Sequence, residues 1–272
     1  MLVTRLPCPV LRPFVRTLWA ADPEPGQGPV DGAREHVLPT GDMHIAFRLS
    51  GPPLQVFDST EDRTGHSFGY AVVGGARSVH YARDTSAPGH SAGVQLRAGA
   101  AWALLGAPAC ALAETHTPLE LLWGAAARHA LERMHAADGA QDRLDVLEQL
   151  LIGRLRAARG LHPAVAHGLQ RLVDGATVQA AVEHSGASHR HFIALFREGT
   201  GLAPKTYSRL LRFQEVLRRL AAEPGLGAAE LAHELGYSDQ AHFQRDFRAF
   251  SGLTPQEWKR AAPVHTHHVP VR

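Results

Sequence analysis

The sequence has few of the residues that mark secreted, membrane or redox proteins. Its 272 residues include only two cysteines, Cys8 and Cys110, which are far apart and form no C-x-x-C pair. That count argues against a disulfide framework and fits a reducing compartment. No apolar run approaches the roughly 20 residues of a membrane-spanning helix, and the N-terminus lacks the charged-then-apolar order of a signal peptide. We therefore expect a cytoplasmic protein.

Catalytic motifs are also missing. The chain has no G-x-S-x-G, no phosphate-binding loop and no G-x-G-x-x-G after a strand, so we predict no catalytic residues and no cofactor. A β-domain metal site needs two or three histidines and a glutamate at strand spacing, and the histidines of the first half are single and scattered. We expect no metal site among them: His36, His44, His66, His80 and His90.

The composition is that of a globular protein with two domains of ordinary size, since 44% of the residues are apolar and 20% are charged. The net charge of +2 is unevenly divided. Residues 161–272 hold 13 Lys and Arg against 10 Asp and Glu, whereas residues 1–160 hold 15 against 16. The C-terminal part is therefore mildly basic, which is weak support for nucleic-acid binding by itself.

The first hundred residues have the texture of a small β-barrel or sandwich. In residues 43–49, Met43, Ile45, Phe47 and Leu49 alternate with His44, Ala46 and Arg48, which predicts a half-buried strand. Residues 51–57, 67–73, 78–83 and 91–97 give further short strands separated by turn residues. The segment LRPFVRTLW near the N-terminus fits either a short helix or a strand.

Helical spacing replaces this pattern after residue 97. We predict a short helix in GAAWALLG, a longer helix over residues 118–134 begun by Pro118, and a third over about 142–159. In the third, leucines recur in a 3-4-4 pattern and need a partner. Packing onto the β-rich domain and a two-fold helix contact between two copies are both open. The stripe consists of Leu144, Leu147, Leu151 and Leu155.

Near the C-terminus, the segment GYSDQAHFQRDFRAFSGLTPQEW predicts a capped amphipathic helix over residues 239–250. Asp239 can cap its N-terminus, Gly252 ends it, and Pro255 starts the next helix. An apolar stripe of phenylalanines recurs at i, i+4 and i+7. The other face carries forked donors and acceptors that suit base edges and phosphates: Gln240, His242, Gln244, Arg245 and Arg248.

The same design occurs 51 residues earlier, in SGASHRHFIALFREGTGLAPKTY. Ser188 matches Asp239, Phe192 matches Phe243, and Gly201 matches Gly252. A short Ala-rich helix and a glycine turn precede each copy, over residues 178–184 and 228–235. Helix, glycine turn and a second helix with a polar face form the helix-turn-helix pattern, so the chain contains this motif twice.

Two such motifs joined by a long helix, with ELAHELGYSDQAHFQRDFRAFSGLTPQEW in the second, closely resemble the DNA-binding domain of AraC/XylS-type bacterial transcription regulators. The resemblance covers roughly residues 165–262. Residues 5–155 resemble the β-rich, cupin-like sensor portion of one branch of these regulators, through LRPFVRTLW, LPTGDMHIAF, GVQLRAGAAWALLG and PLELLWG. It implies effector binding in or near that barrel.

The expected fold class is therefore α+β, with a small β-barrel or sandwich and following helices, and then an all-α domain with two helix-turn-helix motifs. We place a regulatory domain at residues 1–160, a DNA-binding domain at 161–262 and a flexible tail at 263–272. HTHH at residues 265–268 lies in that tail.

Two other interpretations are weaker. A plain helical core without a DNA role explains the phenylalanines but not the duplicated polar face. An enzyme or DNA-repair protein of the Ada kind shares this DNA-binding domain but needs a four-cysteine zinc cluster, which two cysteines cannot supply.

The mechanism that follows is recognition by two helices, over residues 188–198 and 239–250, held by a linker helix over 205–222. They would enter successive major grooves about 34 Å apart. Residues expected under both motifs are Tyr207, Leu210, Leu211, Val216, Leu217 and Leu220. We assign base reading to Arg190, His191, Ile193, Gln240, His242, Gln244 and Arg245. We assign phosphate contacts to Ser188, His189, Arg197 and Arg248.

One departure from the family matters for specificity. Members commonly have arginine where this chain has Ala194, the position that matches Arg245, and Ile193 matches Gln244. The first recognition helix therefore lacks its two best hydrogen-bonding base readers, although Ile193 and Ala194 can meet thymine methyls. Expected partners are double-stranded DNA with two adjacent half-sites, RNA polymerase where the protein activates transcription, and a small-molecule effector. Both a monomer and a homodimer fit, and no membrane is involved.

Overall fold

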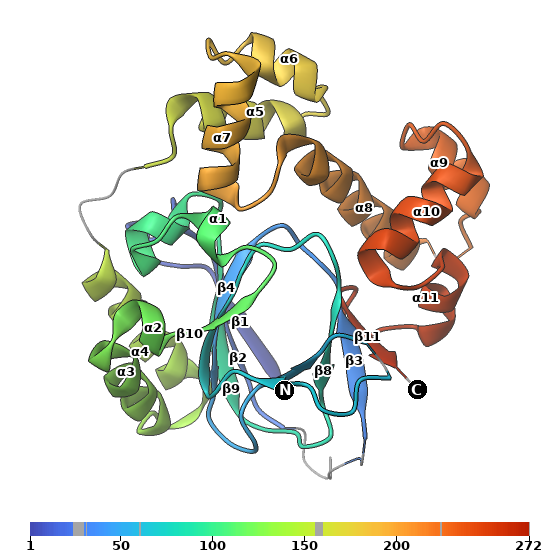
Figure 1. The fold of residues 1–272 in the computed structure, drawn as a ribbon. Helices are drawn as coiled ribbons and strands as arrows, with labels where there is room; N and C mark the ends of the chain where they lie inside the picture. The colour runs from blue at the N-terminus through green and yellow to red at the C-terminus, as the bar shows by residue number, and fades with distance from the viewer. Residues whose placement is uncertain (24–29, 31, 60, 156–159, 224, 272) are drawn as a thin grey trace.

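A computed structural model describes residues 1–23, 30, 32–59, 61–155, 160–223 and 225–271. Two β-sheets, formed mainly by strands within the first 118 residues, make up what we call the β-rich part, and a helical part begins after residue 160 (Figure 1). Helices from the middle of the chain flank the β-rich part on one side, and the helical part lies across its top and opposite side (Figure 1).

The β-rich part contains two sheets whose paired strands run antiparallel. In one sheet the strand order is β1 (Leu2–Arg5), β2 (Val15–Ala21), β9 (Ser91–Leu96), β4 (Met43–Arg48), β7 (Ala71–Gly74) and β10 (His116–Pro118). In the other it is β11 (His268–Val271), β3 (Arg34–Val37), β8 (Tyr81–Asp84), β5 (Gln55–Phe57) and β6 (His66–Ser67). LRPFVRTLW therefore contributes a strand, β2, rather than a helix.

The alternation predicted for residues 43–49 is confirmed in β4. Met43, Ile45 and Phe47 are buried in the main core, and the residues between them are half-buried. β4 lies between β9 and β7, so both of its edges are hydrogen-bonded. A strand in that position needs one face for the core, which is why the period of two was readable.

The single helix predicted over residues 118–134 is wrong. Thr117 and Pro118 instead belong to β10, which pairs with β7, and the helical stretch is divided into α2 (Glu120–Trp123) and α3 (Ala125–His135). Gly124 separates them with φ +59° and ψ −138°, a backbone conformation that only glycine adopts readily. GAAWALLG forms a π-helical turn, η1 (Ala101–Leu105), and α1 (Ala109–Leu112) follows.

The leucine stripe of residues 142–159 packs onto the β-rich part. The helix is α4 (Gly139–Arg154), and Leu144, Leu147 and Leu151 are fully buried in the main core, next to β2, β9 and η1. Of the two partners left open by the sequence, the sheet is therefore the one present. The last part of the predicted helix, residues 156–159, lies outside the described residues.

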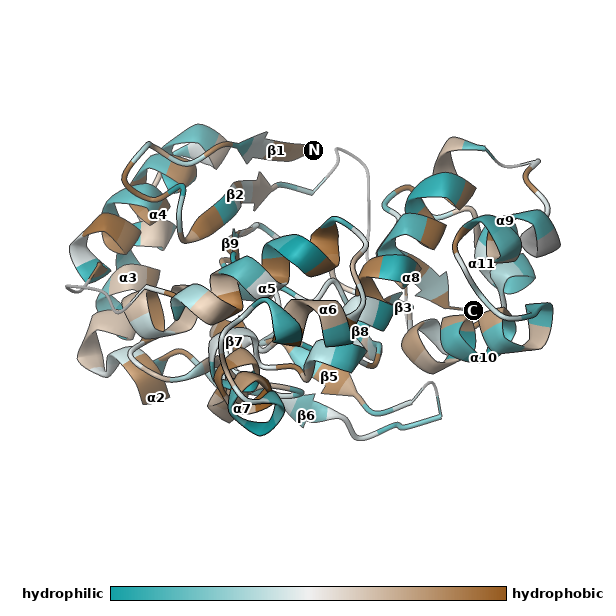
Figure 2. Cartoon of the chain, turned by 90° about the horizontal axis from the view of Figure 1, so that it is seen from above, coloured by the Kyte–Doolittle hydropathy of each residue, from teal (hydrophilic) through white to brown (hydrophobic). Residues whose placement is uncertain are grey.

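The helical part follows the predicted order closely. Its helices are α5 (Pro163–Val173), α6 (Val178–Glu183), α7 (His189–Thr200), α8 (Pro204–Ala222), α9 (Ala228–Glu234), α10 (Gln240–Ser251) and α11 (Pro255–Ala261). Figure 2 shows teal and brown residues alternating along α4 and α8, as expected of helices with one buried face. Along α8 the buried side chains include Phe213, which the prediction omitted, whereas Leu211 is only half-buried.

The tail predicted to be flexible from residue 263 differs from the structure, because residues 268–271 form β11. This strand pairs antiparallel with β3, from His268 opposite Val37 to Val271 opposite Arg34. Val269 is 1% exposed, and Trp258 Nε1 donates to the carbonyl of Thr266. A short polar segment can be ordered in this way when an open sheet edge offers it backbone hydrogen bonds. In the parts of the chain that are described, no helix has the length and apolarity to cross a membrane.

Candidate nucleic-acid interface

The first recognition helix, α7, is defined by local signals at both ends. The Ser188 hydroxyl accepts from the backbone N–H of His191 (3.4 Å), and Gly201 ends the helix at φ +86°. Phe192 and Phe196 are fully buried. The Phe192 ring lies so close to Gly168 of α5 that a Cβ at that position would be 2.6 Å from it. Burial of these rings leaves the opposite, polar face of α7 toward solvent.

The second recognition helix, α10, repeats this construction. Asp239 Oδ1 accepts from the backbone N–H of His242 (2.7 Å), and this hydrogen bond lowers the pKa of the carboxyl group. Gly252 ends the helix at φ +73°. Even the ends match: the Ser251 hydroxyl donates to Phe247 and accepts from the N–H of Leu253, and Thr200 does the same one repeat earlier. The duplication read from the sequence therefore extends to side-chain hydrogen bonds.

Most of the predicted base-reading side chains lie on the open faces of these helices. Ile193 is half-buried, and His242 is half-buried as well. The His242 ring lies near the N-terminus of α10, with Nδ1 3.1 Å from the Ser238 hydroxyl. The ring also contacts that of Tyr237 in a T-shaped arrangement. The exposed members of the set are Arg190, His191, Gln240, Gln244 and Arg245.

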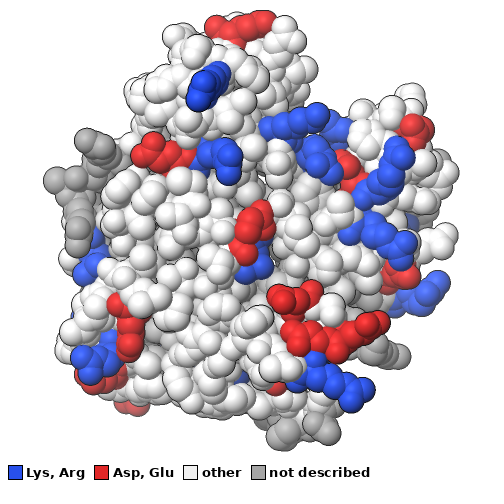
Figure 3. All heavy atoms as spheres, viewed as in Figure 1, with Lys and Arg blue, Asp and Glu red and all other residues white. Residues whose placement is uncertain are grey.

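The predicted phosphate-contacting residues divide into two kinds. Ser188 is exposed but its hydroxyl caps α7, so its backbone and hydroxyl mark a helix start at which N–H groups face outward. His189, Arg197 and Arg248 are exposed. In Figure 3 Lys and Arg side chains gather at the upper right, over α8, α10 and α11. The basic surface is therefore on the same part of the molecule as the second recognition helix.

One residue that positions α10 was missed by sequence reasoning. Asp246 is 5% exposed, and its two oxygens accept from Arg209 of α8, at 2.7 Å from Nη2 and 3.2 Å from Nε. The signal was available, because Asp246 lies three residues after Phe243 and four before Phe250, on the buried stripe. A carboxylate there needs a cation on a neighbouring element.

The β-rich part contacts the C-terminal ends of both recognition helices. The backbone N–H of Gly99 donates to the carbonyl of Gly199 (2.9 Å), and that of His80 donates to the carbonyl of Phe250 (3.0 Å). Gly199 and Phe250 are 51 residues apart and therefore occupy the same position in the two copies. His36 adds a ring nitrogen 3.3 Å from the carbonyl of Ser251.

Further contacts join the linker helix and the tail to the β-rich part. Gln214 of α8 donates from Nε2 to the carbonyl of Pro39, and its Oε1 contacts His267 Nε2. His268 Nδ1 lies 2.7 Å from Glu35 Oε1, which Arg83 also contacts. Burial lowers the pKa of His80 and of His267 to about 4, so both rings are neutral near pH 7.

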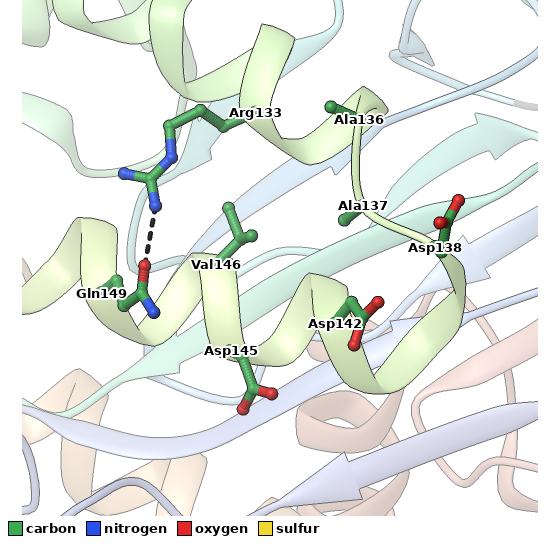
Figure 4. A pocket seen from close by; sticks show the side chains of 8 residues that line it. All are labelled: Arg133, Ala136, Ala137, Asp138, Asp142, Asp145, Val146 and Gln149. Atoms are coloured by element: carbon green, nitrogen blue, oxygen red, sulfur yellow. Dashed lines mark hydrogen bonds between the residues drawn. The ribbon is translucent and has the colours of Figure 1, made fainter.

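Two hollows lie outside the recognition faces. One, of about 400 Å³, lies between η1, the residues before α5, and α7, and includes Trp102, Leu161 and Glu198 in its lining. The other, of about 420 Å³, is an open depression between α3 and α4 that includes Asp138, Asp142 and Asp145 (Figure 4). Arg133 and Gln149 are hydrogen-bonded across it. Within the described residues, no group of three His, Cys, Asp or Glu side chains has the arrangement of a metal site.

Residues 181–261 match the family described as a helix-turn-helix domain, and residues 3–118 match a domain of unknown function, DUF6597. No curated protein is similar enough to count as a match. Three solved structures are similar to this chain at low identity. The C-terminal domain of AraT, a response regulator from Geobacillus stearothermophilus, has 19% identity, covers 39% of this chain and 90% of its own, and gives a TM-score of 0.36. ToxT from Vibrio cholerae has 6% identity, covers 95% and 98% respectively, and gives 0.44. ToxT from Vibrio cholerae O395 bound to (E)-4-(8-methylnaphthalen-1-yl)but-3-enoic acid has 9% identity, covers 95% and 98%, and gives 0.45.

The helix-turn-helix match covers α7 to α11, which include both capped helices with open polar faces, and it indicates a DNA-binding protein. The chain therefore has an AraC-type helix-turn-helix domain at residues 181–261 and a DUF6597 domain before it, at residues 3–118.

Proposed function

We propose that this regulator binds double-stranded DNA with α7 and α10 in successive major grooves, so that one copy covers two adjacent half-sites. The observation that carries the proposal is the repetition, 51 residues apart, of a capped helix with an exposed polar face. Figure 1 shows the two helices at opposite ends of α8. The 19 residues of α8 span about 28 Å, which is comparable with the groove repeat of about 34 Å.

The side chains divide into two roles in this arrangement. Arg245 and Gln244 are the principal base readers, because a guanidinium and an amide can each make paired hydrogen bonds with a base edge. Arg197 and Arg248, at the matching position of each copy, contact phosphates and fix the register. Residues 161–262 act as the DNA-binding domain and residues 1–160 as its regulatory domain, and the protein acts as a regulator rather than as an enzyme.

Control by the β-rich part acts through its contacts with the recognition helices. The backbone N–H groups of Gly99 and His80 donate to carbonyls at matching positions of α7 and α10. The β-rich part therefore fixes the position of both helices relative to itself. A Cβ added at Gly201 would lie 3.1 Å from Ala76 and 3.4 Å from Ala113, so the end of α7 packs closely against these two alanines. We call Ala76 and Ala113 the α7 contact site. A movement of the α7 contact site changes the position of α7 relative to α10. The distance between the two DNA half-sites that the protein can bind changes with it.

Selection of bound sequences from a random DNA pool tests the DNA-binding proposal. We expect two enriched half-sites whose centres are about 10 base pairs apart. The affinity should fall linearly with the logarithm of salt concentration, and Arg248→Ala should lower the slope by about 0.9 for every sequence alike. A pool without enrichment, or an affinity that does not change with salt, would contradict the assignment.

A larger side chain at the α7 contact site tests the proposal that the β-rich part controls DNA binding. Ala113→Leu enlarges a half-buried side chain against Gly201, far from the DNA face, and should change the DNA affinity or the preferred half-site spacing. Ala111→Leu is the matched control, because Ala111 is exposed in α1, the short helix that ends just before Ala113. If both variants bind DNA like the original protein, the α7 contact site does not control DNA recognition.

A further inference from the structure

The C-terminal strand β11 is joined both to the second motif and to the β-rich part. Trp258 of α11 is 4% exposed, and its Nε1 donates to the carbonyl of Thr266 (3.2 Å), just before β11. On the other side, β11 pairs antiparallel with β3, and the backbone N–H of Leu38 donates to the carbonyl of His267 (2.8 Å). The segment after α11 therefore connects the last helix of the second motif to a sheet formed by the first half of the chain.

The residues of β11 suit a strand that pairs with β3 alone. Val269 is buried in the main core, whereas Pro270 is exposed. The backbone N–H of His268 donates to the carbonyl of His265 and therefore faces away from β3. Backbone N–H groups alternate in direction along an antiparallel strand, so the Pro270 nitrogen faces away from β3 as well. A proline there removes no hydrogen bond to β3, and it leaves the outer edge without a donor for a further strand.

The turn that leads from α11 to β11 has a strained backbone. Ala262 has φ +42° and ψ +58°, in the left-handed region that favours glycine. A residue with a side chain stays in that region only where the surrounding contacts hold it there. In the first copy the matching residue is Leu211, which continues the helix α8. The turn is therefore a feature of the second motif alone, and the contacts of β11 with β3 hold it.

β11 pairs with the same residue of β3 that contacts the end of α10. Val269 lies opposite His36, and a ring nitrogen of His36 lies 3.3 Å from the carbonyl of Ser251. Beside it, the backbone N–H of His80 donates to the carbonyl of Phe250 (3.0 Å). The last residues of α10 thus contact a surface that β11 helps to form, and a change in the pairing of β11 reaches them directly.

We infer that β11 fixes the position of the second recognition helix relative to the β-rich part, and that its detachment from β3 frees the end of α10 while α7 stays held. The first motif has contacts of its own. The backbone N–H of Gly99 donates to the carbonyl of Gly199 (2.9 Å), and Gly201 packs against the α7 contact site. These contacts include no residue of β3 or β11. Two attachments that share no residue can open separately.

The consequence for DNA rests on the proposed function. With β11 paired, the distance between the two recognition helices is fixed twice, by α8 and by the β-rich part. With β11 detached, α8 alone fixes it, and a single helix can bend. The pairing of β11 therefore narrows the range of half-site spacings that the protein binds, and its detachment widens that range.

Amide hydrogen exchange of the full chain without DNA, measured residue by residue, tests the inference. Val269→Asp places a charge at a side chain that is 1% exposed and should detach β11. We expect exchange about tenfold or more faster at Leu38 and at His80, and a change of less than about twofold at Gly99. Val264→Asp is the matched control, because Val264 is 93% exposed, and it should change none of the three. An unchanged rate at Leu38 or His80, or an equal increase at Gly99, would overturn the inference.

A disulfide between β11 and β3 provides a rescue. Val37 and His268 lie opposite each other, so cysteines at both positions are within the reach of a disulfide. Added to Val269→Asp, the oxidised pair Val37→Cys and His268→Cys should restore slow exchange at His80, and a thiol reductant should abolish the rescue. The original protein, with its two native cysteines, should respond to neither treatment. Fast exchange at His80 in the oxidised variant would also overturn the inference.

Selection from a DNA pool in which the spacing of the half-sites varies tests the consequence for DNA. The original protein and Val264→Asp should enrich one spacing, and Val269→Asp should enrich a wider range. If the original protein enriches no pair of half-sites, the proposed function fails, and hydrogen exchange still decides whether β11 holds the second motif. If all three proteins enrich the same single spacing, the proposed function stands and the role of β11 in spacing is overturned.

Discussion

Arg209 and Asp246 join the linker helix α8 to the recognition helix α10 through a two-point ion pair, with Nη2–Oδ1 and Nε–Oδ2 distances of 2.7 and 3.2 Å. The two side chains differ in their access to water: that of Asp246 is 7% exposed and that of Arg209 is 37% exposed. The pair has no counterpart in the first copy, where the position of Asp246 is occupied by Leu195. The second recognition helix is therefore joined to α8 by this ion pair, whereas the first has an apolar side chain at the matching position.

This asymmetry predicts unequal costs for removing either partner. Arg209→Ala leaves a buried carboxylate whose remaining ion-pair partner among the described residues is His242, at 4.0 Å, and should lower the free energy of unfolding by about 2–4 kcal/mol. Asp246→Ala leaves an arginine that can reach water and should cost about 1–2 kcal/mol. Urea unfolding of the full chain measures both. Arg218→Ala is the control, since its pair with Glu215 is largely exposed, and it should leave the free energy of unfolding nearly unchanged.

Sequence specificity should be concentrated in the second motif. Arg245→Ala should relax the preference at one or two base pairs and cost about 1–3 kcal/mol of discrimination, because a bidentate contact with guanine is lost. Arg190→Ala should lower affinity with a smaller change in preference, since Ile193 and Ala194 offer no hydrogen bonds beside it. Binding of both variants to a library randomised in each half-site, at one salt concentration, makes the comparison. Equal information in the two half-sites would contradict the prediction.

The C-terminal strand should stabilise the whole chain. Val269→Ala removes apolar contact from a side chain that is 1% exposed, and we expect a loss of about 2 kcal/mol in the free energy of unfolding. Val264 lies five residues earlier and is 93% exposed, so Val264→Ala should change it by less than about 0.5 kcal/mol. Denaturant unfolding of the two variants decides the matter. Equal stability would mean that β11 does not pair with β3 in solution.

Stability should fall in mildly acidic solution. Burial lowers the pKa of His80 and His267 to about 4 from 6.5, so unfolding takes up protons as the pH falls between these values. Their contribution is complete above about pH 6.5 and is lost progressively toward about pH 4. Thermal midpoints at about pH 7.5 and about pH 5 should show a decrease that becomes smaller in the variant with both His80→Gln and His267→Gln.

Two comparisons sharpen the pH experiment. His135→Gln changes an exposed histidine of α3 and should leave the decrease as it is. Burial raises the pKa of Glu35, but His268 and Arg83 outweigh it and bring the value to about 2 from 4.5, so Glu35 contributes a loss only below about pH 4.5. A midpoint that does not change between about pH 7.5 and about pH 5 would contradict the prediction.

The sequence by itself determined the elements whose signals are local. A cap at Ser188 or Asp239, phenylalanines at helical spacing and a closing glycine all act within one helix, so α7 and α10 were predicted within two residues at each end. The alternation in β4 was equally direct, because a strand with one buried face must place every second side chain in the core. The duplication indicated DNA binding, since two helices with polar faces are repeated 51 residues apart.

Only the tertiary structure decided the features whose partners are remote in the chain. The segment after residue 263 is polar and rich in proline, and it becomes a strand because β3, more than 230 residues earlier, leaves an edge to pair with. The ion pair of Arg209 with Asp246, and the contacts of Gly99 and His80 with Gly199 and Phe250, likewise depend on where distant elements are packed. Local propensity carries no information about such a partner, because the stabilising hydrogen bond exists only after the chain has brought the two segments together.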